Sequence, residues 1–508
     1  MNLLLLVLVP TLTAIAILFG KGLKQVRAIA LVGSVAQLIL CFALLVLYWQ
    51  ERAAGNTAPM LFEFFYPWFD FLRISFHGAV DGISIAMILL TAFVVVAGVL
   101  VSWEMNNKSK EFFFLLIFLS VGAYGFFISV DLFMLFFFLE LSVIPKFLLI
   151  GIWGSGKKEY SAMKLALMLM AGSAFVMVGL FGLYFNVAFS GEGLSTMDIL
   201  RISEITSADG GGAGIPLDEQ LFFFPFLFVG FGIFTALFPF HTWVPDGHSS
   251  APTAASMFLA GISMKLGGYG CLRVATYLMP EAAREYSGII ILLATIAIIY
   301  GAFATLMQKD LKYINAYSSV SHCGFVLLGI GMLTQTAITG AVIQMVSHGL
   351  MTALFFAAIG MIYDRTHTRM VAQLGGLMKA MPFICTVFVI AGLCSLGLPG
   401  FSGFVAEITV FMGSWQQPDT WYRIATILAC SSLVITTVYV LRAVGQSVMG
   451  PVATPQFAGL GDARWNERSA AVLLIAGIVA IGIAPFWLYD LLEPGTQLIM
   501  KQVSGLTN

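Results

Sequence analysis

The chain has 508 residues, of which 59% are hydrophobic and only 10% are charged. Soluble globular proteins carry about 25% charged residues, so this composition excludes a water-soluble enzyme, a disordered chain and a nucleic-acid-binding protein. The 25 lysines and arginines almost balance the 26 aspartates and glutamates, which leaves a net charge of −1 and indicates no polyelectrolyte partner. We therefore expect a polytopic membrane protein that contacts lipid and binds no nucleic acid.

The sequence carries no motif for a redox cofactor, a nucleotide or a metal. It has no CxxC pair, Cys/His cluster, GxGxxG, P-loop or haem-attachment motif. The cysteines are scattered through apolar stretches and are expected to pack as small buried hydrophobic side chains (Cys41, Cys271, Cys323, Cys385, Cys394 and Cys430). No cofactor or metal is therefore expected in this chain.

Apolar runs long enough to cross a bilayer, which takes about 20 residues, recur along the whole chain. In chain order they lie at about 3–19, 28–48, 80–102, 112–129, 131–152, 162–187, 221–243, 253–277, 287–306, 314–333, 336–362, 382–411, 424–447 and 470–492. This pattern predicts an all-α polytopic membrane protein with about 14 transmembrane helices. The first run has no basic residues before it, so it is expected to be a membrane helix rather than a cleaved signal.

The distribution of basic residues predicts the orientation. Most lysines and arginines fall in the loops that follow odd-numbered spans, whereas the two long joints at 50–79 and 190–220 follow spans 2 and 6. Because cytoplasmic loops are enriched in Lys and Arg, we expect the basic loops in the cytoplasm. Both termini and both long joints are then expected on the outer, periplasmic side. No segment resembles a soluble module, so residues 1–508 are predicted to form a single membrane domain.

A few ionisable side chains lie inside the predicted spans, where an unpaired charge costs several kcal/mol. They occupy five separate spans (Glu140, Lys146, Lys265, His322, His348 and Glu407). Acid, base and imidazole groups that are linked by water can relay protons, so we predict that these side chains form a proton relay. Paired structural contacts in the bundle are one alternative. A metal site is another, although HxxxH and ExxH spacings are missing within the spans.

Prolines predict two interrupted helices. Pro239 and Pro245 lie near the end of span 7, and Pro399 lies between glycines in span 12. Proline removes a helical hydrogen bond, and freed backbone at membrane depth is tolerated only beside protein or a water-filled cavity. Spans 7 and 12 run in opposite directions, which predicts two inverted five-helix repeats, spans 4–8 and 9–13. His241 and His248, near the cytoplasmic loops, are expected either to bond within the loops or to serve proton uptake or partner contact.

Several long motifs resemble those of one membrane-protein family. The stretch PFHTWVPDGHSSAPTAASMFLAGISMKLGGYG is similar to the signature of the antiporter-like subunits of respiratory complex I and of Mrp sodium/proton antiporters. The similarity extends to AVDGIS at 79–84, FLELSVIP around Glu140, AMK at 162–164, QKDLKYINAYSSVSHCG at 308–324 and LPGFSGFVAE at 398–407, and so covers nearly the whole chain. The chain looks most like subunit M, the chain 4 type. Glu407 matches the M type where L and N types usually carry a lysine, and there is no room for the lateral helix of the L type.

This resemblance implies a role for each buried ionisable side chain. Glu140 would be the span 5 glutamate of a charged pair, and Lys265 would be the central lysine of span 8. His322 and His348 would continue the row towards Glu407, which would end the hydrated path near the outer side. Quinone reduction elsewhere would supply the energy, so this chain would perform no redox chemistry itself.

One position departs from the family pattern. The family places a lysine on span 7, five residues before the proline of the PxHxW element, and that position is Phe234 here. Lys146 is a candidate substitute, although six residues of unbroken helix would turn it about 240° away from Glu140. Pro145 would have to bend the helix, or Lys146 would have to reach into the space of the missing lysine. The alternatives are a subunit with weakened pumping and a Lys146 that extends to the cytoplasmic edge.

The leading interpretation is therefore an M-type proton-translocating subunit of a complex-I-like NAD(P)H- or ferredoxin-quinone oxidoreductase in a bacterial plasma membrane. Its partners would be adjacent L- and N-type subunits and other membrane and peripheral subunits. The chain would divide into residues 1–110 (helices 1–3), 111–280 (helices 4–8, the first repeat), 281–450 (helices 9–13, the second repeat) and 451–508 (a loop and helix 14). The alternative function is a Mrp-type Na⁺/H⁺ antiporter subunit, and a third is a structural spacer that has lost its pump.

Overall fold

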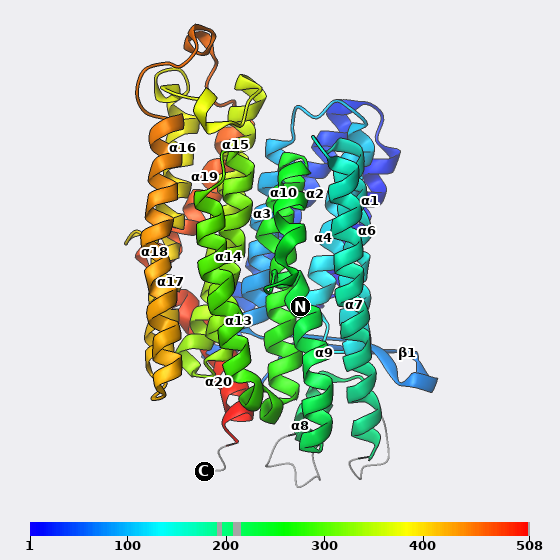
Figure 1. Cartoon of the computed structure of the whole chain (residues 1–508). Helices are drawn as coiled ribbons and strands as arrows, with labels where there is room; N and C mark the ends of the chain where they lie inside the picture. Colours follow the sequence, from blue (N-terminus) through cyan, green and yellow to red (C-terminus); the bar gives the residue numbers. More distant parts are fainter. Residues whose placement is uncertain (190–195, 207–214, 506–508) are drawn as a thin grey trace.

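Long apolar helices form most of the structure, a computed structural model that describes residues 1–189, 196–206 and 215–505. Among those residues, ten helices are long and apolar enough to cross a membrane by length and composition. The helices stand roughly along one common axis (Figure 1). Those without an internal break are α1 (Leu5–Phe19), α2 (Leu23–Ala53), α3 (Gly82–Val101), α4 (Ser109–Ile128), α7 (Lys158–Phe189), α13 (Pro280–Leu306), α14 (Leu311–Gly331), α15 (Gln335–Thr366) and α18 (Thr420–Ser447).

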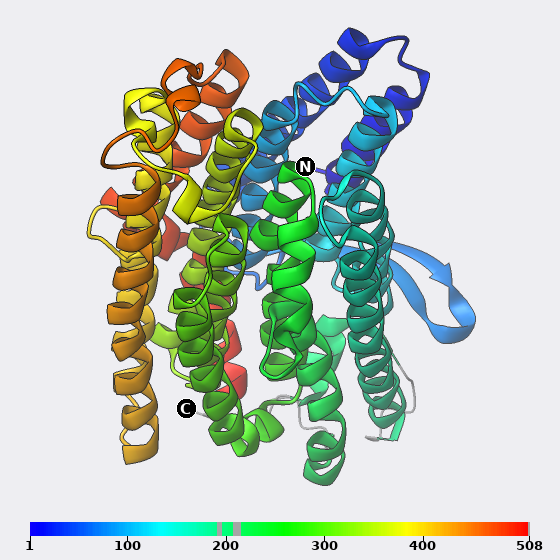
Figure 2. The same cartoon turned by 45° about the horizontal axis from the view of Figure 1, so that its top comes forward.

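Two helices form the centre of the bundle. The most apolar stretches of α3 and α15 are 94% and 100% buried, whereas those of α2, α7 and α18 are 33%, 44% and 39% buried. Figures 1 and 2 show α7 and α18 on opposite sides of the bundle. A helix that is apolar all round lies either in a protein core or against lipid, so α3 and α15 make the core and the outer helices meet the lipid.

The predicted interruption of span 7 is present, with one correction. Helix α9 (Leu217–Thr235) ends at Ala236, which has a φ of +69°, and the chain resumes at η3 (Phe240–Thr242) and α10 (Trp243–Ser250). The indole N–H of Trp243 donates to the carbonyl oxygen of Ile233 at 2.9 Å, so the helix end is capped from across the break. Pro239 lies within the break, but Pro245 does not interrupt the helix as predicted. It lies in the first turn of α10, where a proline costs no hydrogen bond.

The interruption of span 12 is also present. Helix α16 (Pro382–Ser395) and α17 (Ser402–Trp415) are separated by a short connection around Pro399. Gly397 and Gly400 have φ values of +71° and +96° there, a region that glycine enters without steric cost. The proline and glycines of the LPGFSG motif therefore break the helix, and they are visible in the sequence alone.

Two further spans are less regular than predicted. Span 5 divides at Ser142 into α5 (Leu132–Leu141) and α6 (Val143–Trp153). Pro145 explains the division, because proline cannot donate to the carbonyl four residues back and its ring clashes there. Span 8 consists of α11 (Thr253–Phe258), the π-helical segment η4 (Leu259–Ser263), α12 (Met264–Gly270) and the π-helical segment η5 (Cys271–Thr276).

The last predicted span, 470–492, is in fact two helices. Helix α19 (Trp465–Ile483) ends just before Pro485, and α20 (Phe486–Ser504) follows it. Proline at this position cannot continue the hydrogen-bond ladder of α19. The chain therefore carries about a dozen more helical residues after this span than the hydropathy pattern predicted.

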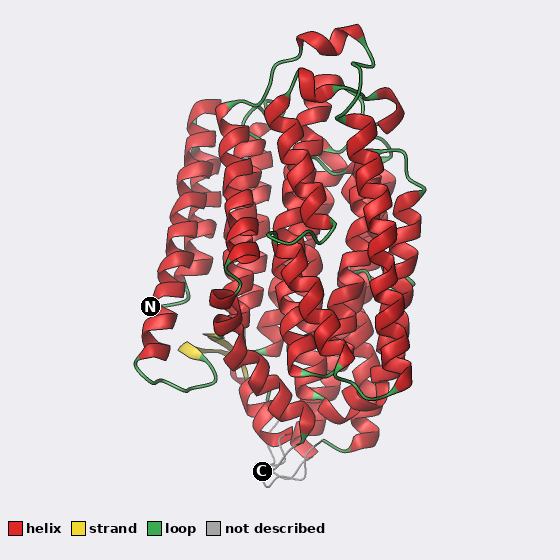
Figure 3. Ribbon diagram, turned by 90° about the vertical axis from the view of Figure 1, so that its left-hand side faces the viewer, coloured by secondary structure: helices red, strands yellow, loops and turns green. Residues whose placement is uncertain are grey.

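One segment departs from the all-α prediction. The joint at 50–79 contains an antiparallel hairpin of β1 (Leu61–Phe69) and β2 (Ile74–Val80), in which Phe65 pairs with His77. Figure 3 shows these strands in yellow beside the helices. The other long joint contains the short helix α8 (Ile199–Thr206). The His77 Nδ1 lies 2.6 Å from Asp198 Oδ2, which shows that the two joints lie on the same side of the bundle, as predicted.

Close approach of α9 and α12 gives a test of the packing at Gly267. A Cβ placed on Gly267 would lie 2.3 Å from the Thr235 hydroxyl and 2.4 Å from the Phe231 carbonyl oxygen. We expect Gly267→Ala to lower the free energy of unfolding by about 1–3 kcal/mol through overpacking. Gly288→Ala is the matched control, because a Cβ at Gly288 meets no atom within 4 Å. Thermal unfolding in detergent measures both, and equal midpoints for the two variants would contradict the packing.

Candidate functional site

A lysine and a histidine meet in the buried centre of the bundle. Lys265 on α12 and His348 on α15 are each 1% exposed. The Lys265 Nζ lies 2.6 Å from Nδ1 of His348 and 2.6 Å from the carbonyl oxygen of Ala260. Ala260 belongs to the π-helical η4, which interrupts the regular helical ladder. A lysine ammonium can only donate, so Nδ1 of His348 accepts and the imidazole proton is assigned to Nε2.

A second histidine continues this contact. The rings of His348 and His322, on α14, have centroids 5.3 Å apart and an angle of 30° between their planes. The Nε2 of His322 lies 3.1 Å from the Ser395 hydroxyl, and its Nδ1 lies 3.3 Å from the amide nitrogen of Gln344. The imidazole therefore has a polar neighbour at each nitrogen within the core.

A buried carboxylate ends the row. Glu407 on α17 is 3% exposed, and its Oε1 lies 3.6 Å from Nδ1 of His322. Its Oε2 lies against Gly397, where an added Cβ would approach to 2.3 Å. The break between α16 and α17 thus makes room for the carboxylate, and Lys265, His348, His322 and Glu407 lie in one row.

The two predicted side chains of span 5 lie apart from this row. Glu140 is half-buried and accepts a hydrogen bond from Ser173. Lys146 is 0% exposed, donates to the Ser142 hydroxyl at 2.9 Å and has its Nζ 6.0 Å from the ring centroid of Phe234. Among the described residues, no ion pair within 4 Å joins Glu140 to Lys146, although the two charges interact through space.

The two histidines predicted for proton uptake are both buried. His241 lies in η3 within the break of span 7, 3% exposed, with its ring against Phe238 and Tyr300. His248 lies on α10 and is 0% exposed, and it interacts electrostatically with Lys265. By strict hydrogen-bond geometry neither imidazole has a partner in the described part of the chain, and the backbone of Pro239 is the polar group that interacts with His241.

Three further contacts of charged residues could not be predicted from the sequence. Asp81, before α3, and Arg273, in η5, form an ion pair that is almost fully buried, with side chains 0% and 2% exposed. Arg273 falls inside the predicted span 253–277, which was the available signal. Lys164 on α7 binds Asp246 on α10 at 2.7 Å, and Lys312 on α14 donates to the carbonyl oxygen of Ala251 at 2.7 Å.

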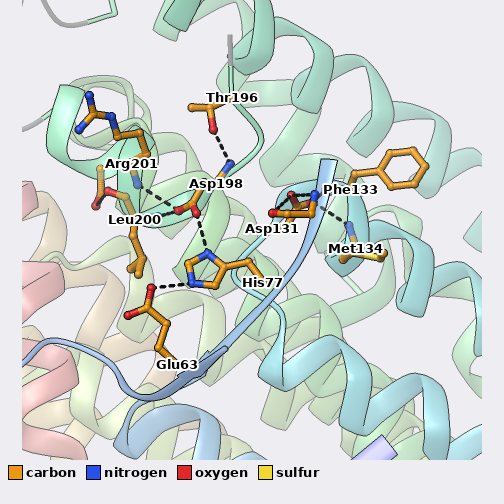
Figure 4. Close-up of polar contacts among 11 residues, drawn as sticks. Glu63, His77, Asp131, Phe133, Met134, Thr196, Asp198, Leu200 and Arg201 are labelled. Atoms are coloured by element: carbon orange, nitrogen blue, oxygen red, sulfur yellow. Dashed lines mark hydrogen bonds and ion pairs between the residues drawn. The ribbon is translucent and has the colours of Figure 1, made fainter. Parts of the chain in front are cut away.

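A polar cluster ties the hairpin to α8 (Figure 4). The His77 ring lies between two carboxylates, with Nδ1 2.6 Å from Asp198 Oδ2 and Nε2 2.8 Å from Glu63 Oε1. Asp198 also accepts from the backbone N–H groups of Leu200 and Arg201 and so caps α8. Burial lowers the pKa of His77, but hydrogen bonds and charges from Asp198 and Glu63 outweigh burial and raise that pKa above its ordinary value.

A second carboxylate ties the hairpin to α5 in the same way. Asp131 caps α5 by accepting from the N–H groups of Phe133 and Met134, and it also accepts from the Ser75 N–H of β2 at 3.0 Å. Figure 4 shows Asp131 beside the strand that carries His77. The hairpin is therefore bound to two helices by carboxylates that also cap those helices.

The family model for the transmembrane region shared by NADH:quinone oxidoreductase and Mrp antiporter subunits matches residues 129–436. This chain belongs to that family. The matched region contains every side chain of the row and both side chains of span 5. The inference from motifs is thereby confirmed at the level of the family.

Curated relatives place this family member among the chain 4 subunits. It is 38% identical to the NAD(P)H-quinone oxidoreductase chain 4-2 of Synechocystis sp., over 95% of this chain and 89% of that protein. It is 34% identical to a NAD(P)H-quinone oxidoreductase chain 4 of Picosynechococcus sp., over 98% of this chain and 94% of that protein. The assignment to the M or chain 4 type is therefore confirmed.

Solved structures share the fold over almost the full length. A chain of respiratory complex I from Thermus thermophilus matches with a TM-score of 0.88 and 23% identity, over 99% of both chains. A chain of the Mrp complex from Dietzia sp. matches with a TM-score of 0.82 and 18% identity, over 99% of this chain and 97% of that chain. These likenesses establish the antiporter-like fold of a multi-pass membrane protein.

The His77 cluster predicts that attachment of the hairpin weakens as pH rises. Because the pKa of His77 is raised from 6.5, the charged contacts are complete below that ordinary value and are lost as pH rises through the raised pKa. The pKa of Asp198 is lowered from 3.8, so its contribution is lost only as pH falls through that lowered pKa. We expect hydrogen-exchange protection of residues 61–80, corrected for intrinsic rates, to fall at alkaline pH by a free energy of about 1–2 kcal/mol.

Two histidine variants separate this effect from general alkaline loosening. His77→Gln should show low protection of the hairpin at every pH, because glutamine cannot carry the charge. His367→Gln, at an exposed histidine outside the cluster, should behave as the unmodified chain. A hairpin whose protection follows the same pH curve in the unmodified chain and in His77→Gln would contradict the prediction.

Proposed function

We propose that this family member is the M-type, chain 4, membrane subunit of a NAD(P)H-quinone oxidoreductase and that it moves protons along its buried polar row. The observation that carries the proposal is the row of neighbouring ionisable groups from Lys265 through His348 and His322 to Glu407. Each of these groups loses hydration on burial. A helix bundle with no transport role gains nothing from four buried ionisable groups in one line, whereas a protein that carries protons needs them.

The contact distances support a stepwise transfer. Lys265 Nζ and His348 Nδ1 are 2.6 Å apart, which is short enough for direct proton transfer. The step to His322 spans rings 5.3 Å apart and needs water or a ring rotation, and His322 Nδ1 then faces Glu407 Oε1 at 3.6 Å. Unit charges 4 Å apart interact by about 4 kcal/mol at an effective dielectric constant of 20, so a charge arriving at one group changes the proton affinity of the next.

Lys146 takes the place of the missing span 7 lysine in this proposal. Its Nζ lies 6.0 Å from the ring of Phe234, the position that carries the lysine in the family pattern. The division of span 5 at Ser142 removes the objection from unbroken helical rotation, because α5 and α6 are separate helices. Lys146 also interacts with the charge of Glu140 through space, as the partner in a charged pair must.

His248 and His241 would connect the row to the cytoplasm. His248 interacts electrostatically with Lys265, and Asp246 on the same helix binds Lys164 at 2.7 Å. This arrangement supports a route for uptake along α10, with the ion pair nearer the aqueous phase. His241, in the adjoining break, would admit water where the backbone of span 7 is already interrupted.

The proposed architecture has about 14 spans and two inverted repeats, residues 111–280 and 281–450. The breaks between α9 and α10 and between α16 and α17 support the repeats, since each would hold one interrupted helix. Residues 1–110 and 451–508 would complete the domain. Both termini would face the periplasm of a bacterial plasma membrane, L- and N-type subunits would be the neighbours, and redox cofactors would reside in other subunits.

The function is tested by Lys265→Met in the assembled complex. In vesicles, we expect quinone reduction by the physiological donor to continue while proton translocation falls, because methionine keeps the volume and removes the proton-carrying group. Lys379→Met, at an exposed lysine, is the control and should pump normally. Full pumping by Lys265→Met would contradict the proposal, and sodium-dependent exchange by the isolated chain would instead favour a Mrp-type antiporter.

The relocation of the lysine is tested by Lys146→Met alone and together with Phe234→Lys. Lys146→Met should abolish coupled pumping if Lys146 fills the role of the span 7 lysine. The double variant should regain pumping, because it restores a lysine at the position of the family pattern. Pumping that persists in Lys146→Met, or that stays lost in a double variant that still assembles and reduces quinone, would contradict relocation.

A further inference from the structure

A polar cavity opens at one end of the bundle, on the side that the proposed orientation assigns to the cytoplasm. It has a volume of about 670 Å³ and is lined by the loop after α3, by the end of α15 and by residues around the start of α19. Four carboxylates and two guanidinium groups lie on its walls (Glu104, Asp364, Asp462, Glu467, Arg365 and Arg464). Charged groups keep their solvation only where water reaches them, so this cavity, which we name the vestibule, is hydrated.

Asp364 is the carboxylate of the vestibule that stays available for proton exchange. The other three carboxylates are engaged in ion pairs or in a helix cap (Glu467 with Arg365 at 2.7 Å, Glu104 with Arg464 at 3.2 Å, and Asp462 with the Phe383 N–H at 2.9 Å). Within the described ranges Asp364 enters none of these contacts. It is exposed, and its charge acts through space on the buried Lys312.

Lys312 lies behind the wall of the vestibule. It belongs to the first turn of α14 and is 4% exposed, and its Nζ donates to the carbonyl oxygen of Ala251 at 2.7 Å. Ala251 follows α10 directly and comes two residues before Thr253, which lines the vestibule. Three nearby charges act on the ammonium through space (Asp364, Asp310 and Arg369). Lys312 is therefore a buried base at the edge of a hydrated cavity.

Polar side chains continue from Lys312 along one face of α14. Asn315, Ser319 and His322 follow it by three, seven and ten residues, which is the spacing of a single helical face. All three are buried, so this face is turned into the bundle. Ten residues of helix rise about 15 Å, and the face therefore reaches from the edge of the vestibule to the polar row.

A threonine of α15 joins this face to the second histidine of the row. Thr352 is buried, and its Oγ1 lies 3.3 Å from Nδ2 of Asn315 and 3.4 Å from the Ser319 hydroxyl. It follows His348 by four residues, about one helical turn. Oδ1 of Asn315 and Nε2 of His348 are buried without a hydrogen-bond partner in the part of the chain that the structure describes. Because buried polar atoms are almost always bonded, these two atoms are suited to bind water along this face.

A helix cap is the alternative explanation of Lys312. A lysine that bonds the last carbonyl of α10 stabilises the end of that helix, and this role needs only a positive charge and a donor. It does not require Asn315, Ser319 and Thr352 to follow in line, nor unbonded polar atoms beside them. The polar face therefore favours a path for protons.

We propose that Lys312 carries protons from the vestibule into the polar row, through a second entrance that runs along α14 to the two histidines. This inference rests on the proposed function and adds an entrance to the route along α10. Lys312 would pass one proton inward to water beside Asn315 and, as the neutral amine, take one proton from water beside Asp364. One proton leaves and one arrives in each cycle, so the ammonium is restored.

Lys312→Arg separates a proton path from a helix cap in the assembled complex in vesicles. Arginine keeps the positive charge and can donate to the Ala251 carbonyl, but a guanidinium is not deprotonated in proteins. We expect the number of protons moved per quinone reduced to fall. Lys309→Arg, at an exposed lysine three residues earlier, should keep the full number. A full number in Lys312→Arg would overturn the proposal, because a cap would then account for the lysine.

A second set of variants acts at the vestibule and leaves the buried lysine in place. Asp364→Asn removes a proton-binding group at an exposed position and should lower the same ratio, which Asp364→Glu should restore. Glu104→Gln, at another carboxylate of the vestibule, should leave the ratio unchanged. These variants decide the question if Lys312→Arg does not assemble, and equal ratios in Asp364→Asn and Glu104→Gln would refute the entrance.

Lys265→Met distinguishes this inference from the proposed function. If Lys265→Met pumps normally, the proposed function fails and the entrance fails with it. If Lys265→Met loses pumping whereas Lys312→Arg and Asp364→Asn keep the full ratio, only the second entrance is wrong.

Discussion

A lysine ammonium stays inside a bilayer only where buried acceptors replace its water, and this demand organises the centre of the molecule. Lys265 meets it with His348 Nδ1 and the Ala260 carbonyl, each at 2.6 Å. The first acceptor requires α12 to lie against α15, and the second requires a π-turn in span 8. Close approach of α9 at Gly267 holds the same helix from the other side. Core packing and the polar row are therefore one arrangement, not two.

The helix breaks serve this arrangement as well. The break of span 7 brings His241 into the bundle and is capped by the indole of Trp243. The break of span 12 leaves Gly397 without a side chain, and the carboxylate of Glu407 occupies the space. Irregular backbone therefore lies where polar side chains need room, as expected for backbone that must be satisfied away from lipid.

Much of the fold and of the buried row was predictable from the sequence, because the thickness of the hydrocarbon layer and the cost of desolvation act on single residues or short runs. The lengths of the apolar runs predicted most of the spans, and Pro399 with its neighbouring glycines predicted the break in span 12. Because charged residues are rare within the spans, the few that occur there identified the members of the buried row. The pair of Asp81 and Arg273 is separated by 192 positions, so no local pattern connects it. Pro245 was predicted to interrupt span 7, but the effect of a proline depends on where the next helix begins. The aromatic hairpin sequence lacks the alternation of apolar and polar residues by which a strand packed against a helical bundle could be recognised.

The two π-helical segments have a mechanical consequence for Lys265. It lies on the seven-residue helix α12, between η4 and η5. A π-turn holds one residue more than an α-turn. Moving that extra residue from one π-helical segment to the other would rotate α12 about its own axis by about 100°. Such a turn would carry the ammonium off His348 while the flanking segments stay wound. Span 8 therefore holds Lys265 on a short helix whose rotation the two flanking π-helical segments would permit.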